Sequence, residues 1–153
     1  MPAIENHAWF YVLSDSLEFK LQTCSSAEII LAVTPFNLNT DGYRVSLGML
    51  STVTRLHYAD RTASADTMNL LNCYMLRSYW ITWVGGYVKV GLGKMGTNLI
   101  VQLQDSDQLT IGALSLFTPQ SQGGGEWQVS RSRGKAVNYV ILWLAFTCIF
   151  LLR

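Results

Sequence analysis

Apolar and polar residues alternate along most of the chain, which is the pattern of half-buried β-strands. In LEFKLQT, the residues Leu17, Phe19 and Leu21 fall on one face, and charged or amide side chains fall on the other. Further segments of ordinary strand length follow: AEIILAV, YRVSLGML, TRLHYAD, YWITWV, YVKVGL, NLIVQLQ and LTIGALSLF. Turn residues separate them, including a Gly-Gly pair at 85–86 that is typical of a tight hairpin. The pattern predicts an all-β fold, an antiparallel β-sandwich of jelly-roll or lectin-like type.

One segment departs from this period. Residues 66–76, DTMNLLNCYML, could form a helix, although their mix of aromatic and polar residues fits a loop and strand equally well. The 153 residues suit one domain, because a second domain would leave both short of core. We therefore predict a β-sandwich domain over 1–130 and an apolar tail over 136–152.

The charge of the chain argues against nucleic acid as a partner. Half of the residues are hydrophobic, only 14% are charged and the formal net charge is +1. The eleven lysines and arginines are scattered, whereas binding to a phosphate backbone needs a basic cluster. We therefore expect a globular core with a weakly charged surface and no nucleic acid partner.

Three cysteines are too few for a disulfide framework. Two readings stay open for Cys24 and Cys73. They are either small buried apolar residues or a single disulfide, and a disulfide needs an oxidising compartment. No cysteine or histidine cluster has metal-ligand spacing, so we expect no metal site.

The two ends of the chain differ. The N-terminal segment lacks the basic start and long apolar run of a secretory signal. At ~1.5 Å per residue, residues 136–152 would span roughly 25 Å as a helix, slightly less than a hydrocarbon core. Four readings remain: a short membrane helix preceded by basic residues on its cytoplasmic side, a removable glycolipid-anchor signal after the glycines at 123–125, a buried strand or helix, or an intron translated as protein.

The hexapeptide GLGKMG, residues 91–96, matches the G-x-G-x-x-G pattern of nucleotide-binding turns. That fingerprint works only between a strand and a helix, because the N-terminus of the helix holds the phosphates. A strand pattern precedes the glycines here. The residues that follow, TNLIVQLQD, alternate as a strand and not as a helix. We therefore predict a turn between antiparallel strands and no cofactor.

A series of motifs runs in order from about residue 17 to residue 127: LEFKLQTCSSAEIILAV, DGYRVSLG, VTRL, SYWITWVGGYVKVGLG, LIVQLQD and IGALSLFTPQSQGGGEW. In order and spacing they resemble the farnesoic acid O-methyltransferase-like domain family. One feature departs from the family, which usually has Trp and Asn after the glycine of its third strand. Here Gly48 is followed by Met49, Leu50 and Ser51.

The resemblance implies two different functions. The name of the family implies methyl transfer from S-adenosylmethionine to farnesoic acid. Such transfer usually needs a nucleotide-like pocket at the end of a parallel sheet, which an antiparallel sandwich does not provide. The family also looks similar to extracellular recognition domains, and it occurs inside large proteins of the α2-macroglobulin and complement type.

Five side chains are candidates for a site. Trp80 and Trp83 lie three apart on one strand and so point to opposite faces. We expect one of them to belong to the core. The other could form, together with Arg55, a platform for a sugar or an apolar ligand, or it could cover the edge of a sheet. Asp105 and Asp107 could hold Ca²⁺ with backbone carbonyls or cap a turn.

No catalytic constellation emerges, since His57 has only Asp60 near it in the sequence. We expect a non-catalytic module that recognises a protein or carbohydrate. Its expected location is extracellular, or membrane-associated through residues 136–152, within a larger α2-macroglobulin/complement-like protein. The alternative is a farnesoic acid O-methyltransferase-type enzyme, which predicts a deep apolar pocket beside residues 91–96. A purely structural role predicts no pocket, with Trp80 and Trp83 both covered.

Overall fold

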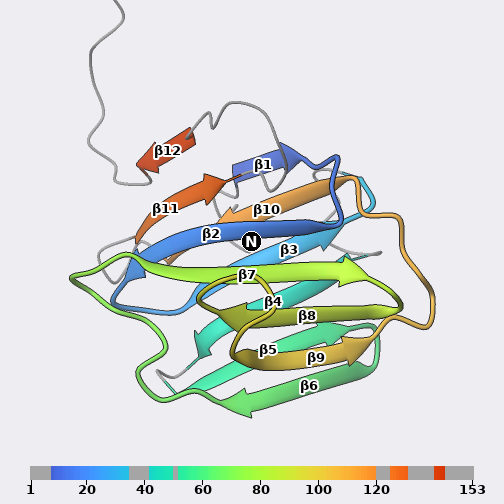
Figure 1. Cartoon of the computed structure of the whole chain (residues 1–153), viewed down its shortest axis with the longest axis horizontal. Coiled ribbons are helices and arrows are strands. Elements are labelled where there is room, and N and C mark those ends of the chain that lie inside the picture. The colour runs from blue at the N-terminus through green and yellow to red at the C-terminus, as the bar shows by residue number, and fades with distance from the viewer. Residues whose placement is uncertain (1–7, 35–41, 50–51, 120–124, 131–139, 144–153) are drawn as a thin grey trace, which may run out of the picture.

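The computed structural model describes residues 8–34, 42–49, 52–119, 125–130 and 140–143. These residues form two six-stranded sheets that lie face to face (Figure 1). All neighbouring strands in the described residues run antiparallel. The predicted all-β class is therefore confirmed.

Each sheet joins segments that are distant in the sequence. Sheet A has the order β1 (Ala8–Tyr11), β10 (Ala113–Phe117), β3 (Ala27–Ala32), β4 (Gly42–Met49), β5 (Val53–Tyr58) and β6 (Arg61–Asp66). Sheet B has the order β12 (Val140–Trp143), β11 (Gly125–Ser130), β2 (Ser16–Thr23), β7 (Arg77–Val84), β8 (Tyr87–Leu92) and β9 (Leu99–Gln104). As a result, β2 pairs with β7 in the middle of sheet B.

The alternation in β2 is an alternation between two faces of sheet B. Leu17, Phe19 and Leu21 are at most 5% exposed and belong to the core. Glu18 and Lys20 lie on the opposite, outer face. The strand forms because one face buries apolar area and the other keeps its charges in water.

In the described residues, the core is a single cluster to which both sheets contribute. In sheet B its centre is aromatic. The ring of Phe19 lies 5.4 Å from the ring of Tyr79 and 5.6 Å from the ring of Trp127, measured between centroids. Aromatic pairs at these distances add packing energy beyond the area that they bury. They hold β11, β2 and β7 together.

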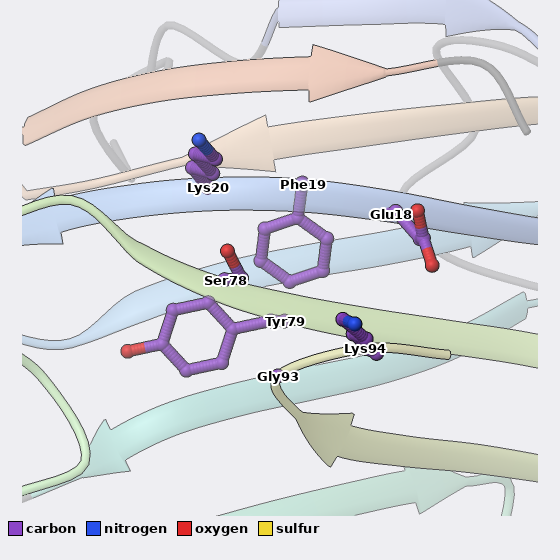
Figure 2. A pocket seen from close by; sticks show the side chains of 7 residues that line it. All are labelled: Glu18, Phe19, Lys20, Ser78, Tyr79, Gly93 and Lys94. Carbon is purple, nitrogen blue, oxygen red and sulfur yellow. The ribbon is translucent and has the colours of Figure 1, made fainter. Parts of the chain in front are cut away.

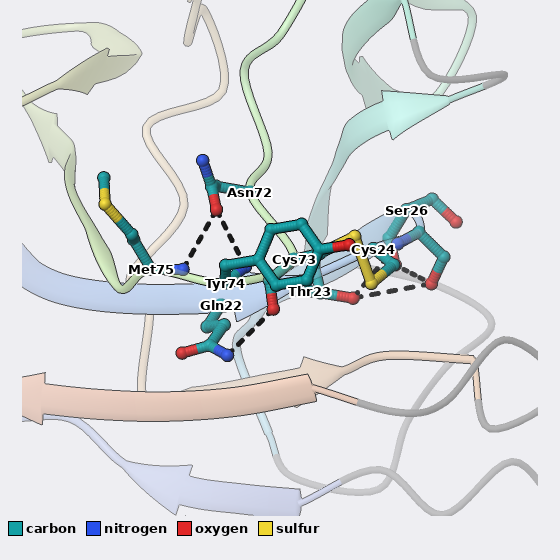
Figure 3. The surroundings of a disulfide bond; sticks show 9 residues. Gln22, Thr23, Cys24, Ser26, Asn72, Cys73, Tyr74 and Met75 are labelled. Carbon is teal, nitrogen blue, oxygen red and sulfur yellow. Dashed lines mark hydrogen bonds between the residues drawn. A yellow bond between two sulfur atoms is a disulfide. The ribbon is translucent and has the colours of Figure 1, made fainter.

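Residues 67–76 form turns and irregular backbone rather than a helix. Asn69 has a left-handed φ of 58°, which interrupts a helix. The side-chain oxygen of Asn72 accepts hydrogen bonds from the backbone amides of Tyr74 and Met75, at 2.8 and 2.9 Å (Figure 3). This local turn competes with a helical ladder, and a loop is the result.

A disulfide between Cys24 and Cys73 fastens this loop to the end of β2 (Figure 3). Two hydrogen bonds support the same junction. The side-chain amide of Gln22 donates to the carbonyl of Cys73 at 2.9 Å, and the amide of Thr23 donates to the carbonyl of Asn72 at 3.0 Å. Of the two readings of these cysteines, the structure has the disulfide.

Within the apolar tail, residues 140–143 form β12, which pairs with β11 and is not part of a helix. The described residues contain no helix that is long and apolar enough to cross a membrane. The rest of the tail lies outside the described residues. So do the glycines at 123–124, and so do Leu50 and Ser51, where the sequence departs from the family pattern.

Candidate ligand-binding site

Of residues 91–96, Gly91 and Leu92 end β8 and the others begin the turn that leads to β9, so a strand and not a helix follows the glycines. Gly93 and Gly96 have φ angles of 88° and 82°, a conformation that other residues rarely adopt. The connection folds back over the outer face of sheet B (Figure 1). In a nucleotide-binding turn, the N-terminus of a helix holds the pyrophosphate. Here β9 follows the glycines in place of that helix.

Gly91 is a glycine because the indole of Trp80 lies directly against it. The two residues are register partners on β7 and β8. A Cβ atom on Gly91 would lie 2.2 Å from the indole ring. The ring is fixed in place, since its Nε1 donates to the carbonyl of Thr97 at 2.7 Å. The glycine thus serves packing.

The amides of the turn donate hydrogen bonds within the protein. Gly93 donates to the carbonyl of Ser78 at 2.7 Å, and Met95 donates to the Oε1 atom of Glu18 at 3.1 Å. The amide of Thr97 donates to the carbonyl of Lys94 at 3.0 Å. A nucleotide-binding turn directs such amides at phosphate oxygens. Here three of them are already used.

A hollow of about 220 Å³ lies between this turn and the strands β2 and β7 (Figure 2). We call it the lysine hollow, and it is lined by Glu18, Phe19, Lys20, Ser78, Tyr79, Gly93 and Lys94. It is smaller than the roughly 300–1,000 Å³ of ordinary small-molecule pockets. With three charged residues in its lining, it differs from the deep apolar pocket that the methyltransferase alternative predicts beside residues 91–96.

The aromatic residues of the lysine hollow belong mainly to the core, because Phe19 and Tyr79 are 2% and 0% exposed. Burial raises the pKa of Tyr79 to about 12. Its hydroxyl is therefore neutral near pH 7 and donates to the carbonyl of Leu70 at 2.6 Å. The chemistry at the mouth of the hollow comes from the exposed side chains of Lys20, Ser78 and Lys94.

The structure does not bring the predicted platform residues together. Trp80 is 3% exposed, and its ring lies against Gly91 and donates to the carbonyl of Thr97, so it is not offered to a ligand. Trp83 is half-buried and packs against the core. Arg55 is exposed on β5, which belongs to the other sheet. These three residues therefore form no common surface.

The two predicted ion ligands have other partners. Asp105 is 6% exposed and accepts a hydrogen bond from the hydroxyl of Tyr43. An oxygen of Asp107 lies 3.4 Å from the guanidinium of Arg61. In the described part of the chain, no group of three or more acidic, cysteine or histidine side chains could hold a metal ion.

The pair formed by Tyr43 and Asp105 joins the two sheets, because Tyr43 lies on β4 and Asp105 follows β9. Burial, together with the hydrogen bond to Asp105, raises the pKa of the Tyr43 hydroxyl well above its usual value. The hydroxyl therefore stays protonated and donates to the buried carboxylate.

Replacing Tyr43 by Phe removes this donor and leaves the carboxylate of Asp105 buried without it. We expect Tyr43→Phe to lower the free energy of unfolding by about 2 kcal/mol, as measured by urea denaturation. The control is Tyr87→Phe, which removes the hydroxyl of a tyrosine that is 39% exposed. Equal midpoints for the two variants would contradict a stabilising role for the pair.

Local sequence reasoning did not find the residues of the lysine hollow. Lys20 was visible only as a solvent-facing residue of a strand, and Lys94 as a residue of a turn. They meet at one hollow because β2 pairs with β7 and because the turn folds back over both strands. No local sequence pattern predicts the pairing of β2 with β7 or the fold-back of the turn.

A family model described as farnesoic acid O-methyl transferase matches residues 4–132. The match extends over strands β1 to β11. No curated protein matches the chain.

Proposed function

Since the chain belongs to the farnesoic acid O-methyl transferase family, we propose that this member acts as a non-catalytic recognition module. Its binding site is the lysine hollow and its partner is a carbohydrate. The fold that we assign to it is a β-sandwich of jelly-roll or lectin-like type. Fold alone does not establish function, so the proposal depends on the site.

The observation that carries the proposal is the use of the turn amides. A methyl donor related to a nucleotide would be held by free backbone amides next to the glycines of the turn. The amides of Gly93 and Met95 instead donate to Ser78 and Glu18. Gly93 therefore forms part of the rim of the hollow instead of a cradle for phosphates.

The exposed side chains of the lysine hollow can pair with a carbohydrate. Its exposed side chains are two ammonium groups and one hydroxyl, from Lys20, Lys94 and Ser78. These groups are hydrogen-bond donors, which match the oxygens of a sugar. None of the large apolar side chains that are exposed in the described residues lines it.

The disulfide supports a location outside the cytoplasm. A bond such as Cys24–Cys73 forms and persists in oxidising compartments. We therefore propose that the module is extracellular or lies on the outer side of a membrane. As part of a larger protein of the α2-macroglobulin or complement type, it would supply a surface for recognition.

A panel of immobilised neutral and acidic carbohydrates tests this function. We expect the purified chain to bind at least one of them. Ser78→Leu should weaken that binding by about tenfold, because a larger uncharged side chain fills the hollow and removes a hydroxyl. Ser64→Leu is the matched control, since Ser64 is also an exposed strand serine but lies in sheet A. Absence of binding, or equal losses in the two variants, would contradict the proposal.

The description of the family suggests an alternative function. The chain would then be an enzyme of the farnesoic acid O-methyltransferase type that uses S-adenosylmethionine. This reading requires a cofactor site beside residues 91–96. A calorimetric titration of S-adenosylmethionine into the purified chain is expected to give no binding heat. Saturable binding that Gly93→Ala abolishes would favour the enzyme over the recognition module.

A further inference from the structure

We propose that the lysine hollow binds the carboxylate or sulfate group of an acidic carbohydrate. This inference rests on the proposed recognition function and specifies the class of its ligand. It also assigns a role to two lysines that come from distant parts of the chain.

The backbone fixes the three groups that would contact the anion. Lys20 and Ser78 are register partners on β2 and β7, so their side chains project side by side from the outer face of sheet B. The amide of Gly93 donates to the carbonyl of Ser78 at 2.7 Å. This bond sets the following residue, Lys94, at the same hollow (Figure 2).

In the described part of the chain, the ion pairs are Arg44 with Glu28 and Arg61 with Asp107, and neither includes Lys20 or Lys94. Two like charges around one hollow repel each other, and a bound anion relieves that repulsion. An anion would also accept charge-assisted hydrogen bonds, which are stronger than neutral ones.

Glu18 also lines the hollow, so its negative charge must be considered. One of its carboxylate oxygens, Oε1, accepts the amide of Met95 at 3.1 Å. This contact directs the carboxylate at the turn and ties the turn to β2. Glu18 thereby acts as a positioning residue for the turn that carries Lys94.

The polar groups beside Lys20 match a carbohydrate as the source of the anion. The hydroxyl of Ser78, its register partner on β7, pairs with sugar hydroxyls. Its register partner on β11 is the half-buried Gln128, whose side-chain amide donates to a carboxylate oxygen of Glu126 at 3.0 Å. Polar side chains therefore flank Lys20 on both neighbouring strands.

Calorimetric titrations with glucuronic acid, a 6-sulfated N-acetylglucosamine, glucose and inorganic sulfate test this inference. We expect the two acidic sugars to bind about tenfold more tightly than glucose or free sulfate, and to lose affinity as salt rises. The double variant Lys20→Gln/Lys94→Gln should lower their affinity by about tenfold. Lys89→Gln/Arg44→Gln removes the same net charge away from the hollow and should change the affinity less than about twofold.

Equal losses in the two double variants would overturn the inference, because they would indicate a general effect of charge. Equal affinity for acidic sugars and glucose would overturn it too and would leave the recognition function standing. Free sulfate binding as tightly as the sulfated sugar would overturn the assignment to a carbohydrate. Failure of all three sugars to bind would overturn this inference, and the wider carbohydrate panel then tests the recognition function separately. Unfolding midpoints establish that each variant is folded. Lys20, Lys94 and Arg44 are exposed, and Lys89 is half-buried.

Discussion

Replacing both Cys24 and Cys73 by serine is expected to lower the free energy of unfolding by about 4 kcal/mol. The disulfide closes a loop with a sequence separation of 49 residues. Closing a loop of that size removes conformational entropy from the unfolded chain, which corresponds to about 4 kcal/mol at 25 °C. Urea denaturation of the wild type and of the double variant measures the difference.

Reduction provides the matched control for this substitution. Dithiothreitol should lower the stability of the wild type to near that of the double variant and should not affect the variant itself. Peptide mapping under non-reducing conditions should recover the fragments of Cys24 and Cys73 as one linked species. Two separate fragments, together with equal stability of wild type and variant, would contradict the bond.

The second large effect is expected at Gly91. A methyl group there would lie 2.2 Å from the indole of Trp80, which is 3% exposed and hydrogen-bonded to Thr97. Overpacking of a fixed ring costs about 3 kcal/mol, so Gly91→Ala should lower the free energy of unfolding by that amount. Gly96→Ala should cost about 1 kcal/mol, because Gly96 has a positive φ but open space around it.

A double-mutant cycle identifies the cause. If the indole is the reason for the glycine, Trp80→Phe should recover part of the cost of Gly91→Ala, because the smaller ring leaves room for the methyl group. The coupling energy from four urea denaturation curves should be on the order of 1 kcal/mol or more. Zero coupling, or equal costs at Gly91 and Gly96, would show that Trp80 does not require the glycine.

Alternation made most of the fold predictable. It predicted the strands β2 to β5 and β7 to β9. In the last predicted segment, LTIGALSLF, only the second half forms a strand, β10. It missed β6, because RTASAD is an edge strand of small and polar residues with no buried position. It also missed β11, where the glycines before Trp127 indicated a turn and obscured the strand that follows.

The site was less predictable than the fold, for a physical reason. Alternation fixes which side of a strand a residue faces, and it correctly separated Trp80 from Trp83. It does not report what covers that side. The indole of Trp80 is buried by the turn that follows the next strand. The lysine hollow arises from the same fold-back, so both features depend on contacts across the sheet.

We propose that Gly93 shapes a recognition site and that the glycines of residues 91–96 do not hold a methyl donor. The most direct measurement is transfer of a labelled methyl group from S-adenosylmethionine to farnesoic acid by the purified chain. The account predicts that the rate stays at the background of a reaction without protein. Transfer above that background, lost on replacing Gly93 by Ala in a folded variant, would contradict it.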